Sequence, residues 1–342
     1  MFPSSKHVAD VVASVLSGLG VGKVEAIAET RAVFGSLLVT DLYHKRGVLA
    51  AAILTKLGAY SKKAVRAVAL AISGAVRCYA AVLHLRHGAN DENPLKFTNK
   101  GYATKFEKVT EFPGRMEQAA KWSDLSGTKR PGSPWLDGLP RLIFVSDMGD
   151  ALSAGVSFEF QKKEIVDVAT SLHSRAHVWL WLTKRPARMV RFSRWLEAQG
   201  VAWPDNLVPM TSVMGQKMAK GVSLLAQIPA KVRGLSVEPL WENVELDLTG
   251  IDWCLVGGES GFQAEPFDLA WARSLRDHAR KCGVAFFMKQ LGTKPQAGGQ
   301  PVVLKDKHGG EWDEWPEDLR VREFPPAFLQ IAEPRKGARK QG

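Results

Sequence analysis

The sequence predicts an α/β fold, a TIM-like (β/α) barrel that is incomplete or irregular in form. Two observations predict this class: strand-length apolar runs alternate with helical patterns, and the runs are apolar on both faces. Strands buried on both faces are typical of parallel sheets covered by helices. The runs lie at Leu142–Val145, Val178–Leu182, Leu207–Val213, Val232–Val237, Trp253–Val256 and Ala285–Met288.

Helical patterns lie between several of these runs. We expect helices at Phe158–Ser171, Ala187–Gln199, Gln216–Gln227 and Leu269–Cys282, and a short one earlier at Arg115–Trp122. Strands that alternate with helices form parallel βαβ units. A further strand candidate at Lys105–Val109, and one within the first eighty residues, would complete a barrel of eight. A doubly wound open sheet is the alternative, but the chain contains neither GxGxxG nor a Walker loop.

Three segments are predicted: a basic helical N-terminal region (1–90), the barrel (91–330) and a basic disordered tail (331–342). Between Leu42 and Asn90 there are eight Lys/Arg and no Asp or Glu. Either this region is a helical arm that contacts a phosphate backbone, or it is a helical layer whose lysines are solvated. The formal net charge of +11 favours a polyanionic partner, and we expect DNA.

Cysteine usage and hydropathy predict a cytoplasmic protein, in the host cytoplasm if a phage encodes it. The three cysteines, Cys78, Cys254 and Cys282, form no CxxC pair, so we expect neither a disulfide scaffold nor a structural zinc site. Met1–Gly22 lacks the features of a signal peptide, and no apolar run reaches the ~20 residues of a membrane span. Cys254 and Cys282 are expected in the core, chemically inert.

Polar side chains follow all six predicted strands. In a barrel the carboxyl ends of the strands meet at one mouth, where such folds place their chemistry. The candidate catalytic residues are the carboxylates Asp147, Asp150, Glu238 and Glu259. The candidate substrate-binding residues are Ser146, Thr183, Lys184, Arg185, Ser212, Gly257, Gly258, Ser260, Lys289 and Gln290. Carboxylates beside cations suit acid–base or nucleophilic chemistry on an anionic substrate.

Each element of this mouth also has a purely structural interpretation. Asp147 and Asp150 could cap the helix that follows, and Lys184–Pro186 could be a surface turn with proline at the first helical position. The succession of six polar strand ends nevertheless favours a site. Trp179 and Trp181 lie two apart and share a face of their strand; they could stack a base, but burial against the helix layer is expected.

Five segments resemble a family of phage and bacterial proteins associated with a three-cysteine motif and long of unknown function. They are Arg141–Asp150, Leu182–Pro186, Leu235–Leu240, Ile251–Gly261 and Ala285–Gln290. That family is similar to radical-SAM barrels, in which three cysteines hold an iron–sulfur cluster. Here Cys78-Tyr79-Ala80 matches the end of the motif, but Ala75 stands where a second cysteine is expected. One thiolate cannot hold a [4Fe–4S] cluster, so we expect no cofactor and no metal.

A branch of such phage proteins is similar to transglycosylases that insert 7-deazaguanines into DNA. The resemblance implies an enzyme that exchanges guanine for a base such as 7-cyano-7-deazaguanine and so protects phage DNA from restriction. Asp150 would then be the nucleophile, Asp147 or Glu259 would read the base, and Lys184 and Arg185 would hold a phosphate. The zinc-binding Cys/His cluster of the related tRNA enzymes is absent. The alternatives are a radical-SAM-type enzyme with a degenerate cluster motif and a non-catalytic DNA-binding barrel.

Overall fold

A computed structural model describes residues 109–332, apart from Asp147, Phe262 and Gln263, and a few isolated positions between Val12 and Ala103. The chain forms two compact units, residues 1–110 and 111–342. In the first unit the described positions include buried helical residues such as Leu16 and Ile53. The eight Lys/Arg of the predicted basic segment, Cys78 and residues 105–108 of the strand candidate at Lys105–Val109 lie outside the described residues.

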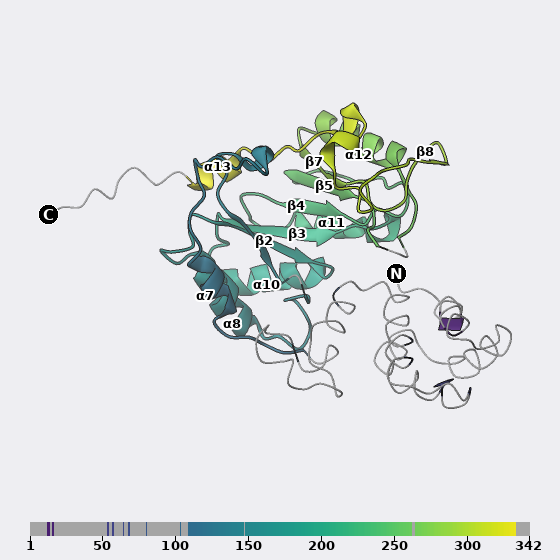
Figure 1. Ribbon diagram of the computed structural model, residues 1–342. Coiled ribbons are helices and arrows are strands. Elements are labelled where there is room, and N and C mark those ends of the chain that lie inside the picture. The colour runs from purple at the N-terminus through teal and green to yellow at the C-terminus, as the bar shows by residue number, and fades with distance from the viewer. Residues whose placement is uncertain are drawn as a thin grey trace. The chain divides into compact units, whose positions relative to one another are not determined.

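The second unit is built on a parallel sheet of six strands. They are β1 (Leu142–Val145), β2 (Val178–Thr183), β3 (Leu207–Ser212), β4 (Gly234–Val237), β5 (Trp253–Gly257) and β7 (Ala285–Gln290). Their order in the sheet is the order of the chain, as Figure 1 shows for β2 to β7. A doubly wound sheet would reverse direction at a switch point, so that alternative is wrong. The sheet curls into a half-barrel, which confirms the α/β class with a barrel-like sheet.

Sequential parallel strands place every crossover helix on the same face, because βαβ crossovers are right-handed. The helices are α7 (Arg115–Ala120), α8 (Phe158–Gln161), a π-helical turn (Lys162–Val166), α9 (Asp167–Ala169), α10 (Pro186–Ala198), α11 (Lys220–Leu225), α12 (Leu269–Lys281) and α13 (Ala327–Ala332). Single turns of 3-10 helix lie at Pro134–Leu136, Gln216–Met218, Trp312–Glu314 and Glu317–Leu319. The predicted helices between the strands are confirmed, with that at Phe158 divided by the π turn and that at Gln216 by a 3-10 turn.

The two faces of the sheet are buried against different partners. On the convex face, Trp179 and Trp181 are fully buried in the main core with residues of the helices, as their spacing predicted. On the concave face, Val178, Leu180 and Trp253 pack around Phe328 of α13. The C-terminal helix therefore covers the concave face near the amino ends of the strands, and the carboxyl ends remain outside this second core.

The two cysteines within the described residues differ in environment. Cys254 is buried on β5, and burial raises the pKa of its thiol to about 12, so the expectation of an inert core cysteine is confirmed. Cys282 is exposed, so the expectation that it lies in the core is wrong. It follows the last turn of α12 and sits beyond the apolar stripe of that helix.

The outer edge of β7 is covered by the chain that follows this strand. A small sheet joins β6 (Phe267–Asp268), which precedes α12, to β8 (Pro295–Ala297) and β9 (Gln300–Pro301), which follow β7. The chain then returns antiparallel along β7, where Met288 N donates to Val321 O at 2.8 Å. The guanidinium of Arg322 lies 4.2 Å from the ring of Trp135, just before β1, and 4.8 Å from that of Trp312. Trp135, which precedes the edge strand β1, is thus in contact with Arg322, which follows the other edge strand, β7.

In the part of the chain that the structure describes, no helix is both long and apolar enough to cross a bilayer.

Candidate functional site

Two groups of polar side chains lie at the carboxyl ends of the strands. They lie on opposite faces of the sheet, because alternate residues of a strand point in opposite directions. The strand register aligns Ser212 of β3 with Ser236 of β4, and Ser236 with Leu255 of β5. Glu238 continues the concave face beyond Ser236. Thr183 and Asp150 form a separate group, toward the helices.

The central contact of the concave group is an ion pair between Glu238 and Lys289. The Lys289 Nζ atom donates to both carboxylate oxygens of Glu238 at 2.9 Å. The Glu238 side chain is 16% exposed and that of Lys289 is 51% exposed. The carboxylate is therefore largely enclosed, while the lysine that pairs with it is half exposed to solvent. The predicted convergence of these two residues is confirmed.

Glycines make room around this pair. A side chain on Gly257 would place its Cβ atom 3.3 Å from the Glu238 carboxyl carbon, which is tighter than ordinary packing allows. A Cβ atom on Gly258 would meet the backbone of Leu291. The Gln290 amide donates to the Gly258 carbonyl at 3.1 Å and to Ser260 Oγ at 2.8 Å. The glycine loop is thus held against the end of β7, and the absence of a side chain at Gly257 lets Glu238 pack closely on it.

Glu259 anchors the same loop. Its Oε2 atom accepts hydrogen bonds from Trp241 Nε1 at 3.1 Å and from Glu265 N at 3.0 Å. Ser260 donates to the carbonyl of His308 at 3.2 Å. One oxygen of Glu259 is thus committed to holding the loop.

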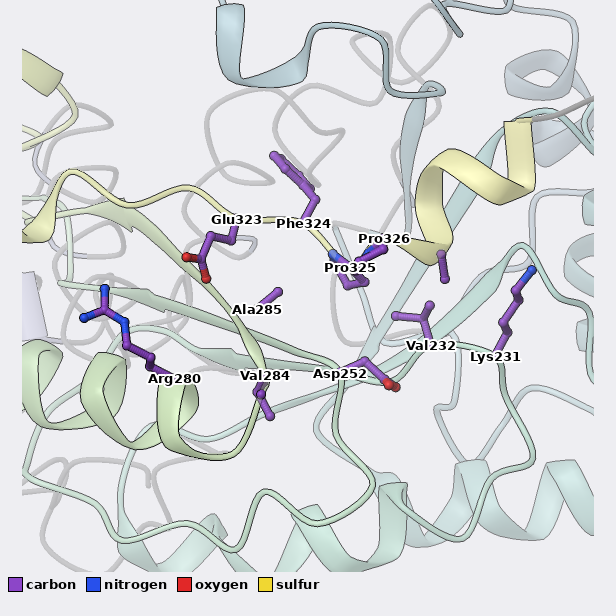
Figure 2. Close-up of a pocket in the computed structure, with 12 residues that line it drawn as sticks. Lys231, Val232, Asp252, Arg280, Val284, Ala285, Glu323, Phe324, Pro325 and Pro326 are labelled. Atoms are coloured by element: carbon purple, nitrogen blue, oxygen red, sulfur yellow. The ribbon is translucent and has the colours of Figure 1, made fainter.

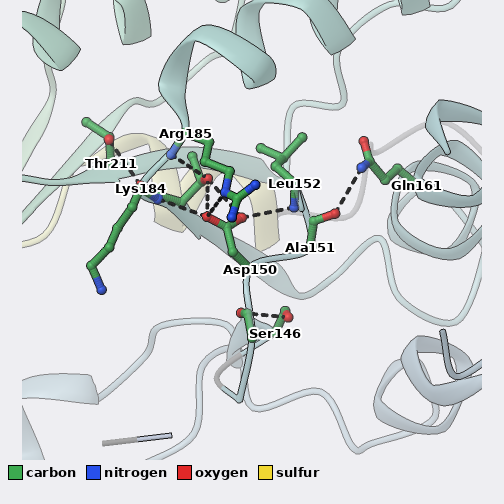
Figure 3. A network of polar contacts seen from close by, with 10 residues as sticks. Ser146, Asp150, Ala151, Leu152, Gln161, Lys184, Arg185 and Thr211 are labelled. Atoms are coloured by element: carbon green, nitrogen blue, oxygen red, sulfur yellow. Dashed lines mark hydrogen bonds and ion pairs between the residues drawn. The ribbon is translucent and has the colours of Figure 1, made fainter. Parts of the chain in front are cut away.

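Asp150 is the centre of the second group (Figure 3). Its carboxylate accepts hydrogen bonds from the Thr183 hydroxyl at 2.9 and 2.8 Å, from Leu152 N at 2.9 Å and from Lys184 N at 3.1 Å. Arg185 Nε lies 3.8 Å away. These donors surround the carboxylate and fasten the loop after β1 to the end of β2. Its contacts are those of a loop-fastening group, with an Asx turn at Leu152 in place of a helix cap.

The remaining predicted residues lie near these two groups. Ser146 has φ of 64° and donates to the Gly149 carbonyl at 2.9 Å, which turns the chain sharply after β1. The Lys184 side chain is exposed and points away from Asp150 in Figure 3. Thr183 is buried, and Asp150 is the one carboxylate within the described residues to which its hydroxyl donates a hydrogen bond. Asp147 lies outside the described residues.

One residue of the concave group escaped the sequence reasoning. Ser236 is a buried member of β4, with 7% exposure, and its register partner Ser212 is 3% exposed. Neither hydroxyl has a hydrogen-bond partner in the described part of the chain, and neither oxygen is fully enclosed. The available signal was a serine inside the apolar run Leu235-Ser236-Val237, since polar residues inside a buried strand need a reason.

A hollow lies at the end of the sheet opposite the polar mouth, among the amino ends of the strands (Figure 2). Its volume is about 440 Å³, and its wall includes Asp252, Val284, Glu323 and Phe324. Both carboxylates already accept backbone hydrogen bonds: Asp252 from Arg233 N at 2.8 Å, and Glu323 from Phe286 N at 3.0 Å. In a barrel fold the amino ends of the strands usually serve stability. These two acids secure the starts of β4 and β7.

Charge is unevenly distributed along the sequence. Residues 111–332 contain 27 Lys/Arg and 27 Asp/Glu, whereas residues 1–110 contain 15 Lys/Arg and 7 Asp/Glu. The net positive charge therefore belongs to the first unit and to the basic tail. Within the described residues no three His, Cys, Asp or Glu side chains gather closely enough to hold a metal ion.

The fold and this mouth define an α/β half-barrel protein with a carboxylate–ammonium pair at the carboxyl ends of its strands. The chain belongs to the family described as "Protein of unknown function (DUF5131)", which it matches over residues 68–319. The match covers the whole sheet and both polar groups. Comparison with the curated proteins and with the solved structures gives no match.

Proposed function

We propose that this protein is an enzyme that exchanges guanine in DNA for a 7-deazaguanine base, such as 7-cyano-7-deazaguanine, by glycosyl transfer at the mouth of the half-barrel. In a phage, such an exchange would protect the DNA from host restriction. The observation that carries the proposal is the Glu238–Lys289 pair, a largely enclosed carboxylate with a half-exposed cation, beside a loop of glycines. Glycosyl transfer needs a carboxylate nucleophile and a proton carrier.

Two strand-end carboxylates, Glu238 and Asp150, contact a cation within the described residues. Glu238 is the better nucleophile of the two. Asp150 accepts from a hydroxyl and two backbone N–H groups, and each of these bonds stabilises the charge that an attack would have to consume. Within the described residues, the Glu238 carboxylate has one partner, the half-exposed ammonium of Lys289. The concave position of Glu238 also faces the open side of the half-barrel mouth.

The exchange balances with these two side chains alone. The bond between C1′ of the nucleotide and N9 of guanine breaks as a bond from Glu238 to C1′ forms. The electron pair stays on N9, which takes a proton from the Lys289 ammonium. The incoming base then gives its N9 proton to the neutral amine and attacks C1′, which releases the Glu238 carboxylate. Lys289 ends protonated as it began, and no oxidant or further reactant is consumed.

DNA contact is assigned mainly to the first unit in this proposal. Residues 111–332 carry no net charge, so long-range attraction to phosphates has to come from residues 1–110 and the tail. Lys184 and Arg185 are exposed at the mouth and would contact a phosphate next to the reacting nucleotide. The half-barrel then supplies the chemistry, and the basic segments supply most of the affinity.

The test is incubation of duplex DNA with the full-length protein and a labelled 7-deazaguanine base, followed by nucleoside mass spectrometry. We expect the labelled base in the DNA and an equal amount of released guanine. Glu238→Gln keeps the shape of the side chain but lowers exchange at least about 1,000-fold, as loss of a nucleophile does. Lys289→Met lowers it about 100-fold or more.

The matched control is Glu197→Gln, which changes an exposed glutamate of α10 on the helix side of the sheet. That variant keeps full activity. Exchange that survives Glu238→Gln in a folded protein would contradict the assignment of the nucleophile. DNA binding without exchange of any 7-deazaguanine base would instead support a non-catalytic DNA-binding barrel.

A further inference from the structure

Two serine hydroxyl groups lie side by side on the concave face just below the Glu238–Lys289 pair. Ser212 and Ser236 are Cα partners on the neighbouring strands β3 and β4. Parallel strands are ~4.8 Å apart, so both hydroxyls can reach one small group placed above them. Glu238 lies two residues after Ser236, just beyond the end of β4.

Their lack of partners is unusual for groups so deeply buried. The two side chains are 3% and 7% exposed, and neither hydroxyl donates or accepts a hydrogen bond within the described residues. Neither oxygen is fully enclosed, so each hydroxyl stays accessible although its residue is buried. Their neighbours on the same face, Leu182 and Leu255, are apolar, so alanine or valine would serve packing alone. The hydroxyls are therefore suited to a group that enters the mouth.

The surroundings favour a flat, uncharged, polar ring. Leu182, Leu255 and Phe287 are half-buried on the same face and offer an apolar surface for the body of such a ring. A phosphate would be repelled by the carboxylate of Glu238 and would have to compete with it for the ammonium of Lys289. A serine hydroxyl both donates and accepts, so a pair can donate to a carbonyl oxygen and accept from the adjacent N–H. That combination is the lactam edge of a guanine-like base.

We propose that Ser212 and Ser236 bind the lactam edge, O6 and N1–H, of the guanine or 7-deazaguanine ring at the mouth. The inference rests on the proposed function for the identity of the ring, but it concerns recognition and not the reaction. The pair positions the base and selects it. Adenine carries an amino group at the same place and no N–H on its ring nitrogen, so it fits the pair less well.

The test compares two soluble nucleosides by calorimetry with the full-length protein. 2′-Deoxyguanosine carries the lactam edge, whereas the deoxyriboside of 2-aminopurine lacks both O6 and N1–H. We expect the wild-type protein to bind 2′-deoxyguanosine about 5- to 100-fold more tightly, since each lost hydrogen bond changes affinity about 2- to 12-fold. In the double variant Ser212→Ala/Ser236→Ala this preference disappears, because binding of deoxyguanosine falls and that of the analogue does not.

Ser223→Ala is the matched control, since Ser223 lies on α11 and donates to the Lys220 carbonyl at 3.2 Å. It leaves both affinities unchanged. The double variant also keeps the wild-type melting temperature, because neither hydroxyl makes a hydrogen bond within the described residues. A loss of melting temperature would indicate a structural role for the hydroxyls and would overturn the inference.

Other outcomes separate this inference from the proposed exchange. A preference for deoxyguanosine that depends on the serines, without any base exchange, supports the inference and contradicts the proposed reaction. Equal binding of the two nucleosides, or no binding of either, overturns the inference whether or not exchange occurs. Loss of inorganic phosphate binding in the double variant, with nucleoside binding intact, would assign the hydroxyls to a phosphate and overturn it too.

Discussion

The hydroxyl group of Thr183 lies within hydrogen-bonding distance of both carboxylate oxygens of Asp150, at 2.9 and 2.8 Å. This contact joins the loop after β1 to the end of β2. We expect Asp150→Asn to lower the free energy of unfolding by about 1–3 kcal/mol, because an amide cannot accept on its nitrogen. Base exchange by the folded variant is expected to continue. Urea denaturation and single-turnover exchange measure the two effects.

Thr183→Val is the companion variant, since it removes the donor and keeps the shape. It should destabilise the protein by a similar amount and also leave exchange intact. Abolished exchange in folded Asp150→Asn, with Thr183→Val active, would identify Asp150 as the nucleophile, the role predicted for it from its position after a strand end.

A second prediction concerns the basic segment of the first unit. Neutralisation of Lys62, Lys63 and Arg66 to glutamine should weaken duplex binding and reduce the slope of log affinity against log salt by about 0.9 for each lost phosphate contact. Neutralisation of three exposed charges of the second unit, Lys163, Lys217 and Lys281, serves as the control and should leave the slope nearly unchanged. Fluorescence anisotropy at several salt concentrations measures both. If the two triple variants gave the same slope, Lys62, Lys63 and Arg66 would contact only solvent and no phosphate.

Arg322 is expected to be a major contributor to stability. Its guanidinium lies over the rings of Trp135 and Trp312 and donates to the carbonyls of Met288 at 3.2 Å and Lys289 at 3.1 Å. Arg322→Ala should lower the free energy of unfolding by about 2–4 kcal/mol, from lost cation–π contacts and two unsatisfied carbonyls. Arg322→Lys should recover only part, because an ammonium group cannot reproduce the planar stack. Urea denaturation measures the free energy of unfolding of both variants. Full recovery of that free energy in Arg322→Lys would contradict this account.

Asp318 should make stability depend on pH in the acid range. Hydrogen bonds from Arg273 and Arg276 lower the pKa of its carboxyl to about 2. A carboxyl whose pKa is lower in the folded state stabilises the protein above its unfolded pKa of ~3.9, and this contribution is lost as the pH falls toward 2. Asp318→Asn should therefore flatten the pH dependence of the melting temperature between about pH 4 and 2. An unchanged profile would show that the pair is screened by solvent.

The sheet was predictable from the sequence because its strands are buried on both faces. Such strands are continuous apolar runs, and five of the six predicted starts, from Leu142 to Ala285, agree with the structure. The exception is β4, predicted from Val232, which begins at Gly234 because Arg233 contacts Asp252 and leaves the ladder. The π turn at Lys162–Val166 was not predictable, because it keeps the same apolar face as an α-helix.

The polar mouth was predictable as a set of strand ends, but its internal division was not. Which strand-end residue faces the concave side depends on register, and register is a relation between strands that no single run contains. Sequence therefore placed Asp150, Glu238 and Glu259 together, whereas the structure gives Glu238 a cation, Asp150 a hydroxyl and Glu259 an indole N–H. Ser236 was missed because its run was interpreted only as core.

The contact between Trp135 and Arg322 also has a consequence for how the protein folds. The two residues lie on either side of the entire sheet in the sequence, so their contact closes a loop that includes every strand of the half-barrel. Contacts of such long sequence separation bear the largest loop-closure entropy and form late. During synthesis, neighbouring strands can pair as they emerge, but the concave face stays uncovered until Arg322 and α13 have left the ribosome. Until then, the apolar surface of this face is exposed and can aggregate.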